Sequence, residues 1–219
     1  LADSVIGIYL SESLTYRIAG HIDHRLSDLD HDDPQYIDKQ MYRDGGGLNA
    51  VTASYRKVAE LTGLFLPLPP SVVVIWSGSD KDDIAPFTRM LGGGVHVMPV
   101  ICSAHKQPAE ACATLGRITQ QHPNAVIIAV AGRSNGLGPL LAANTHLPVI
   151  TVPAGGMDTP EDVWSSLRMP SNVPVMTVMD PANAVREALQ ILAQRDPRIY
   201  ADLRMDLEQR LTNMIVLGD

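Results

Sequence analysis

The chain has 219 residues, of which 45% are hydrophobic and 5% aromatic, and its formal net charge is −7. The length allows one large domain, or a smaller domain with an appendage, packed mainly by aliphatic side chains. The acidic balance argues against a general nucleic-acid surface, which needs a basic stripe, although a small anionic substrate fits a locally positive site.

The sequence argues against a membrane protein and against a secreted protein. No stretch approaches the roughly 20 apolar residues of a membrane span, and the first residues lack a signal-peptide pattern. Two cysteines, Cys102 and Cys112, make neither a disulfide framework nor a zinc motif, so we expect reduced thiols in or near the core of a cytosolic protein. The start without methionine indicates a piece of a longer chain.

Residues 1–63 precede the main pattern and have too little apolar sequence to bury a core alone. Residues 48–63 have apolar positions at helical spacing, with Gly63 as the stop. Residues 21–33 (HIDHRLSDLDHDD) read as a solvated acidic loop in preference to a metal cluster. The proline-rich stretch 64–71 (LFLPLPPS) predicts an extended linker.

From residue 72 onward, short apolar runs alternate with helix-compatible stretches. The predicted strands are 71–77, 95–101, 125–131, 148–152 and 174–178. The predicted helices lie near 83–92, 107–121, 136–145, 160–168, 181–195 and 198–215. Continuous apolar strands alternating with helices predict a three-layer α/β/α, doubly wound parallel sheet over 72–219, in which ligands bind beyond the carboxyl ends of the strands.

The first strand-end loop reads SGSDKDD, residues 77–83. Ser79 and Asp82 either cap the following helix, or Ser79 meets an anion while Asp82 accepts from sugar hydroxyls. Lys81 adds a charge suited to phosphate. The sequence contains no P-loop motif, and no GxGxxG follows a strand.

The next two loops carry the other candidate groups. CSAHKQP (102–108) contains His105, which is either an incidental surface histidine or a general acid/base, with Lys106 as an anion contact. AGRSNGLGP (131–139) offers Gly132 for close backbone approach and Arg133 as a fork for carboxylate or phosphate. The alternative for this loop is a simple helix entry capped by Asn135. A longer loop after the fourth strand contains Ser165, Ser166 and Arg168, which could face the ligand.

Four ordered residue groups stand at these strand ends. They are Gly78-Ser79 with Asp82, Ser103-Ala104-His105-Lys106, Ala131-Gly132-Arg133-Ser134-Asn135-Gly136-Leu137 and Trp164-Ser165-Ser166-Leu167-Arg168-Met169-Pro170. Together, over residues 72–215, they resemble the aminoimidazole ribonucleotide (AIR) carboxylase of purine biosynthesis. The resemblance is to the form that uses CO2 directly and that is, in animals, half of a bifunctional enzyme. Lys81 departs from the family's Gly-Ser-x-Ser-Asp, which has a second serine there.

The resemblance implies a flavodoxin-like fold and carboxylation of 5-aminoimidazole ribonucleotide by CO2, without a cofactor or a metal. It implies His105 as the proton shuttle and Ser134 as the group that holds CO2 or the new carboxylate. The substrate-binding residues that it implies are Gly78, Ser79, Asp82, Ser103, Ala104, Lys106, Gly132, Arg133, Ser134 and Asn135. It also implies a homo-octamer. From charge, hydropathy and cysteine usage we expect a cytoplasmic protein that contacts neither nucleic acid nor membrane.

The front segment is similar to the C-terminal end of the succinocarboxamide-forming (SAICAR) synthetase fused ahead of this carboxylase in animals. Asp38, Lys39, Gln40, Tyr42 and Arg43 carry that likeness. We therefore expect residues 1–63 to be a fragment of a synthetase-like domain, 64–71 a linker and 72–219 the carboxylase domain. The synthetase's nucleotide-binding body is missing, so we expect no ATP or magnesium site.

Three alternatives stay open from the sequence. The ATP-independent mutase branch usually has a glycine/alanine-rich loop with a histidine where this chain has Arg133-Ser134-Asn135, which favours the direct carboxylase. A flavodoxin-like binding module needs aromatic residues around a flavin, and the chain has few. A non-catalytic assembly domain is the third, with the stripe Leu203, Leu207, Leu211 and Ile215 reaching a neighbour.

Overall fold

The computed structural model describes residues 70–91, 94–156 and 158–216, with side chains up to Leu211. The chain divides into two compact units, Pro69–Asp196 and a second that joins Leu1–Leu68 to Pro197–Asp219. The helix predicted at 48–63 and the acidic segment at 21–33 lie outside the described residues, as does the synthetase-like sequence around Asp38.

The unit Pro69–Asp196 is built on one parallel sheet in the order β2-β1-β3-β4-β5. Its strands are β1 (Val72–Ser77), β2 (His96–Ile101), β3 (Val126–Ala131), β4 (Val149–Pro153) and β5 (Met176–Thr177). Every residue of β1 is buried, because both faces of this central strand are covered. The strand order reverses direction between β1 and β3, so the ligand crevice of such a sheet lies at the ends of those two strands.

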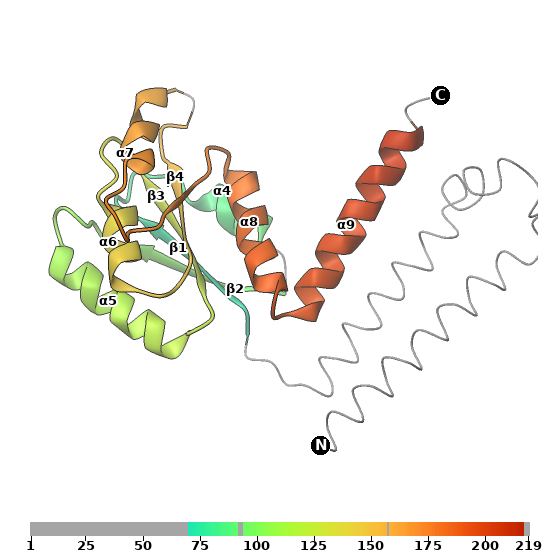
Figure 1. Cartoon of the computed structure of the whole chain (residues 1–219), viewed down its shortest axis with the longest axis horizontal. Helices are drawn as coiled ribbons and strands as arrows, with labels where there is room; N and C mark the ends of the chain where they lie inside the picture. The colour runs from blue at the N-terminus through green and yellow to red at the C-terminus, as the bar shows by residue number, and fades with distance from the viewer. Residues whose placement is uncertain (1–69, 92–93, 157, 217–219) are drawn as a thin grey trace, which may run out of the picture. The chain divides into compact units, whose positions relative to one another are not determined.

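Two pairs of helices cover the two faces of the sheet (Figure 1). The helices are α4 (Ala85–Met90), α5 (Pro108–Gln121), α6 (Leu137–Asn144) and α8 (Pro181–Ala193). On the α5/α6 face, alternate residues of β1 and β3 pack with Leu115, Ile118 and Leu141 in one buried cluster. The opposite residues of the same strands, such as Val73 and Ile75, face α4 and α8. The three-layer, doubly wound fold predicted from the sequence is therefore present.

Two predicted elements differ from those observed. The helix expected at 160–168 is split into a 3-10 helix, η1 (Pro160–Val163), and a single turn, α7 (Trp164–Leu167). The strand expected at 174–178 has only two residues, which pair with Ile150 and Thr151 of β4. Val178 still donates its N–H to the carbonyl of Thr151 at 3.0 Å, so the chain follows β4 beyond β5.

The last described helix, α9 (Pro197–Val216), belongs to the second unit. It contains an i,i+4 ion pair between Arg210 and Asp206 at 3.4 Å, and Leu211 is exposed. None of the described helices is long and apolar enough to cross a membrane.

Candidate active site

The loops that follow β1, β2 and β3 meet at the carboxyl edge of the sheet. Cys102 donates its N–H to the carbonyl of Ser77 at 3.0 Å, which joins the β2 loop to the end of β1. Gly78 donates its N–H to the carbonyl of Val130 at 3.3 Å, which joins the β1 loop to the end of β3. The three loops that the sequence marked for chemistry are thus direct neighbours.

The β1 loop is organised by a serine that sequence reasoning missed. Ser77 is completely buried at the end of β1, and its hydroxyl lies 2.8 Å from Oδ2 of Asp82 and accepts from the N–H of Ser79 at 3.0 Å. The second carboxylate oxygen of Asp82 has no partner among the described residues. Asp82 is therefore held in place with one acceptor left for a ligand. The signal in the sequence was the single polar residue that ends an otherwise apolar strand.

The helix-cap interpretation of this loop is wrong. Helix α4 begins only at Ala85, and its first N–H donates to Oδ1 of Asp83 at 3.0 Å. The Ser79 hydroxyl instead accepts from the N–H of Lys81 at 3.1 Å, in a turn that leaves the Lys81 side chain exposed. Ser79 and Asp82 thus take no part in starting the helix.

The β2 loop is a tight turn over the edge of the core. The N–H of Gln107 donates to the carbonyl of Ser103 at 2.8 Å, and the N–H of Lys106 to the Ser103 hydroxyl at 3.3 Å. Ala104 packs into the buried α5/α6 cluster, so only its backbone can reach a ligand. The turn points His105 and Lys106 toward solvent.

His105 is also brought against the third loop. A Cβ added to Gly136 would overlap the His105 imidazole, with Cε1 only 2.6 Å away. The ring therefore fills the space over the backbone of Gly136, two residues after Ser134. The sequence placed these residues in separate loops, and the structure places them side by side.

The β3 loop is held by the segment that follows β4. Arg133 has a φ of 56°, a left-handed conformation that costs a non-glycine residue about 1–2 kcal/mol. Its N–H donates to Oδ2 of Asp162 at 2.7 Å. The hydroxyl of Ser165 lies 3.1 Å from the Arg133 carbonyl and accepts from the N–H of Asn135 at 2.9 Å. Asp162 and Ser165 thus hold the loop backbone, and neither role was anticipated from the sequence.

Asn135 differs from the other candidate residues because its side chain is buried and engaged. Its Oδ1 accepts from the N–H of Gly138 at 2.8 Å, and its Nδ2 donates to the hydroxyl of Ser166 at 2.9 Å. Ser166 is itself buried, and its carbonyl accepts from the hydroxyl of Thr177 at 3.3 Å. Asn135 therefore helps to fix the start of α6, but the N-cap is Gly136, and not Asn135 as the helix-entry interpretation had expected.

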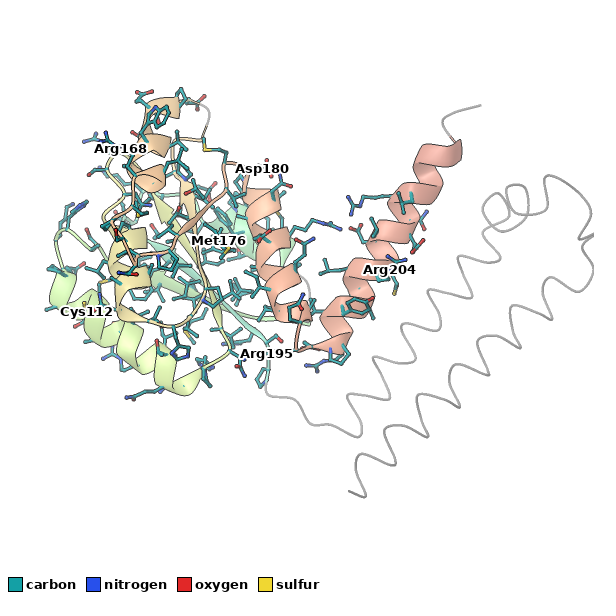
Figure 2. The ribbon with its side chains drawn as sticks, in the orientation of Figure 1. Cys112, Arg168, Met176, Asp180, Arg195 and Arg204 are labelled. Carbon is teal, nitrogen blue, oxygen red and sulfur yellow. The ribbon has the colours of Figure 1, made fainter. Side chains whose placement is uncertain are left out.

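Unpaired cations surround these loops. Lys81, Lys106 and Arg133 are exposed, and their side chains have no ion pair or hydrogen bond among the residues that the structure describes. Arg168, at the end of α7, is likewise exposed and unpaired within the described ranges (Figure 2). The hydroxyl of Ser134 is also exposed and without a partner among them. An anionic ligand at this edge would meet several donors that no protein group already occupies.

The two cysteines are both free, and they differ in environment. Burial, and secondarily the charge of Glu110, raise the pKa of the Cys102 thiol above its usual range. Cys112 is exposed on α5, so the expectation of two core thiols holds for Cys102 only (Figure 2). Within the described ranges, no group of three or more His, Cys, Asp or Glu residues is arranged to hold a metal ion.

The fold and these loops define a doubly wound α/β protein with unpaired polar and cationic groups at the carboxyl edge of its sheet. Residues 71–212 match the family model of AIR carboxylase, and the chain belongs to that family. This confirms the resemblance found in the sequence.

Two curated relatives support the same family. The chain is 35% identical over 190 residues to the probable multifunctional protein ADE2 of Caenorhabditis elegans, covering 82% of this chain and 44% of that protein. It is 35% identical over 186 residues to the human bifunctional phosphoribosylaminoimidazole carboxylase/phosphoribosylaminoimidazole succinocarboxamide synthetase, covering 80% of this chain and 44% of that one. The chain therefore spans less than half the length of these relatives.

A crystal structure of PurE from Treponema denticola has the same fold. It matches with a TM-score of 0.60 and 27% identity, and the match covers 66% of this chain and 94% of that one. The flavodoxin-like fold expected from the sequence is confirmed.

Proposed function

We propose that this chain carboxylates 5-aminoimidazole ribonucleotide with CO2 to give the 4-carboxy ribonucleotide, a reaction of purine biosynthesis. The observation that carries the proposal is the contact between the His105 ring and the loop that contains Ser134. A proton-transfer group then lies beside a loop suited to a carboxyl group, at the carboxyl edge of the sheet. Family membership and the names of the relatives support the same reaction.

The chemistry needs little from the protein beyond placement and proton transfer. The exocyclic amine of the substrate pushes electron density into the ring, so the neighbouring C4 attacks CO2 and a carbon–carbon bond forms. The C–H bond at C4 then breaks, its electron pair restores the aromatic ring, and the proton passes to the His105 imidazole. No oxidant, reductant or hydrolysed nucleotide is needed for this balance. Orientation of the reactants can supply several kcal/mol, about 7 at the low end of intramolecular cases.

The other residues divide into those that contact substrate and those that position them. Ser134 holds CO2 and the growing carboxylate through its hydroxyl and its own N–H. The phosphate and carboxylate contacts are Ser79, Ser103, Lys106 and Arg133, with Gly78 and Gly132 allowing close backbone approach. Asp82 accepts from the ribose hydroxyls through the carboxylate oxygen that Ser77 leaves open. Ala104 and Asn135 act through their backbones and packing, because their side chains are buried.

The test is a carboxylation assay with purified protein, ribonucleotide and dissolved CO2, without ATP or magnesium. Formation of the 4-carboxy product under these conditions is the expected result. Strict dependence on ATP would overturn the proposal. Turnover only with the N-carboxyamino ribonucleotide would instead assign the mutase reaction, and no turnover with either substrate would leave an assembly role.

The same family membership supports three further proposals. The protein acts as a homo-octamer in the cytoplasm, residues 1–63 are a synthetase-like fragment, and 64–71 is a linker to the carboxylase domain that begins at residue 72. The apolar residues Leu203, Leu207 and Leu211 of α9 favour association. Light scattering at micromolar protein concentration tests the octamer, and a monomer mass would reject it.

A further inference from the structure

The space above Gly136 is filled by a side chain of the candidate site, the His105 imidazole. A Cβ at this position would lie 2.6 Å from Cε1 and 2.9 Å from Cδ2 of His105, and closer still to Nε2. These separations are shorter than carbon atoms tolerate. Position 136 can therefore carry no side chain while the imidazole stays where it is.

The need for glycine here is one of space and not of backbone shape. Gly136 has φ −83° and ψ −20°, in the right-handed region that any L-residue adopts. It occupies the N-cap position of α6, and its N–H donates to the carbonyl of Ser134 at 2.9 Å. An alanine at this position would keep the backbone unstrained, and the three atoms nearest its Cβ would all belong to the His105 ring.

Nothing else among the described residues fixes that ring. His105 is exposed, and its imidazole makes no hydrogen bond or ion pair within them. An added methyl group at position 136 would thus turn the imidazole away from the loop, toward solvent, at little cost to the fold. The position of the ring therefore depends on the absence of a side chain at Gly136.

We propose that Gly136 is a positioning residue, whose missing side chain forms a seat for the His105 imidazole next to Ser134. The proposal rests on the proposed function, because the seat matters for turnover only if His105 moves the proton. A shift of about 1 Å in a reacting group can cost about a hundredfold in rate. The seat therefore predicts a catalytic defect from a substitution that touches neither the substrate contacts nor the backbone.

The experiment compares Gly136→Ala with Gly116→Ala in the full chain. Gly116 lies on the exposed side of α5, and a Cβ there would meet nothing within 4 Å. We expect Gly136→Ala to lower kcat by at least about tenfold while KM and the thermal midpoint stay close to wild type. Gly116→Ala should leave kcat and KM unchanged and raise the thermal midpoint slightly, because alanine stabilises a helix interior relative to glycine. Unchanged kcat in Gly136→Ala would overturn the proposal.

A second readout separates the seat from the role of His105. In protein with labelled histidine, the Cε1 resonance of His105 is assigned by its loss in His105→Asn. Gly136→Ala should shift this resonance and Gly116→Ala should not; an unmoved resonance would reject the seat even if kcat fell. If His105→Asn keeps full turnover, the proposed role of His105 fails, while the resonance still tests the seat. In the His105→Asn background, Gly136→Ala should have no further effect on the thermal midpoint, and an added loss there would also count against the seat.

Discussion

The backbone N–H of Arg133 donates to the carboxylate of Asp162, 29 residues later in the chain, at 2.7 Å. Arg133 has a left-handed φ, and this carboxylate accepts its N–H in that conformation. The same carboxylate also accepts from the hydroxyl of Thr159 at 3.1 Å. The conformation of the β3 loop is thus supported by a residue outside it.

This relationship predicts different outcomes for two substitutions of Asp162. Asp162→Ala removes the acceptor, and a hydrogen bond to a charged group is worth about 1.5–3 kcal/mol, so kcat/KM should fall by roughly tenfold or more. Asp162→Asn keeps an oxygen for the Arg133 N–H and should stay within about threefold of wild type. Steady-state assays of both variants decide, with the exposed neighbour Glu161→Ala as the control. Equal losses in both Asp162 variants would show that the charge matters and the backbone bond does not.

His105→Asn tests the proton shuttle. Asparagine keeps polar contacts but cannot titrate, and acid/base groups contribute about a hundred- to ten-thousand-fold, so turnover should fall by at least about a hundredfold. Substrate affinity and thermal midpoint should hold. His146→Asn is the matched control, because His146 is exposed and follows α6 at the opposite edge of the sheet. A loss below tenfold with the fold intact would move the role to Lys106.

Ser77→Ala tests the buried hydroxyl that holds the β1 loop. The substitution leaves the Ser79 N–H and the Asp82 carboxylate without their partner, at a cost of about 1–3 kcal/mol. A protein of this size should then melt about 2–4 °C lower for each kcal/mol, and KM should rise because Asp82 is no longer fixed. Calorimetry and steady-state kinetics measure the two effects. The exposed Ser171→Ala should change neither, and an unaltered KM in Ser77→Ala would separate Asp82 from substrate binding.

The two thiols should react at different rates. The pKa of Cys102 is raised by burial and by Glu110, so its buried thiol stays neutral to a higher pH than usual, whereas Cys112 is open to solvent. Since the thiolate is the nucleophile, iodoacetamide at about pH 8 should label Cys112 first. Peptide mass spectrometry reads the order directly. Faster labelling of Cys102 in folded protein would contradict the burial.

The same shift fixes a pH dependence of stability. A raised pKa in the fold means that the neutral thiol is favoured there, so its contribution to stability is complete below the ordinary thiol pKa, about 8.5. This contribution to stability is lost as the pH rises through the higher pKa that Cys102 has in the folded protein. The thermal midpoint of wild type should therefore fall more steeply than that of Cys102→Ala above about pH 9. If the thermal midpoints of the two proteins fell equally steeply with pH, the Cys102 thiol would make no such contribution to stability.

The sequence predicted the central strands within about one residue because their burial on both faces leaves a continuous apolar run, as in β1 and β3. It overestimated β5, an edge strand that pairs with β4 at only two residues, because an apolar pattern does not reveal how far pairing extends. The strand-end loops could be found because topology places ligands there. Two features of the site could not be predicted. Asp162 binds a backbone N–H that is 29 residues away in the chain, and Gly136 matters only through the His105 ring that lies where its side chain would be.

The bonds from Asp162 and Ser165 also bear on how the native state opens. The amide hydrogens of Arg133 and Asn135 are covered by acceptors on η1 and α7, outside their own loop. These amides can exchange with solvent only when the two segments separate, which makes them one cooperative unit of local unfolding. Hydrogen exchange of the β3 loop would then report the docking of residues 160–167, and a ligand that slows one should slow the other by the same factor.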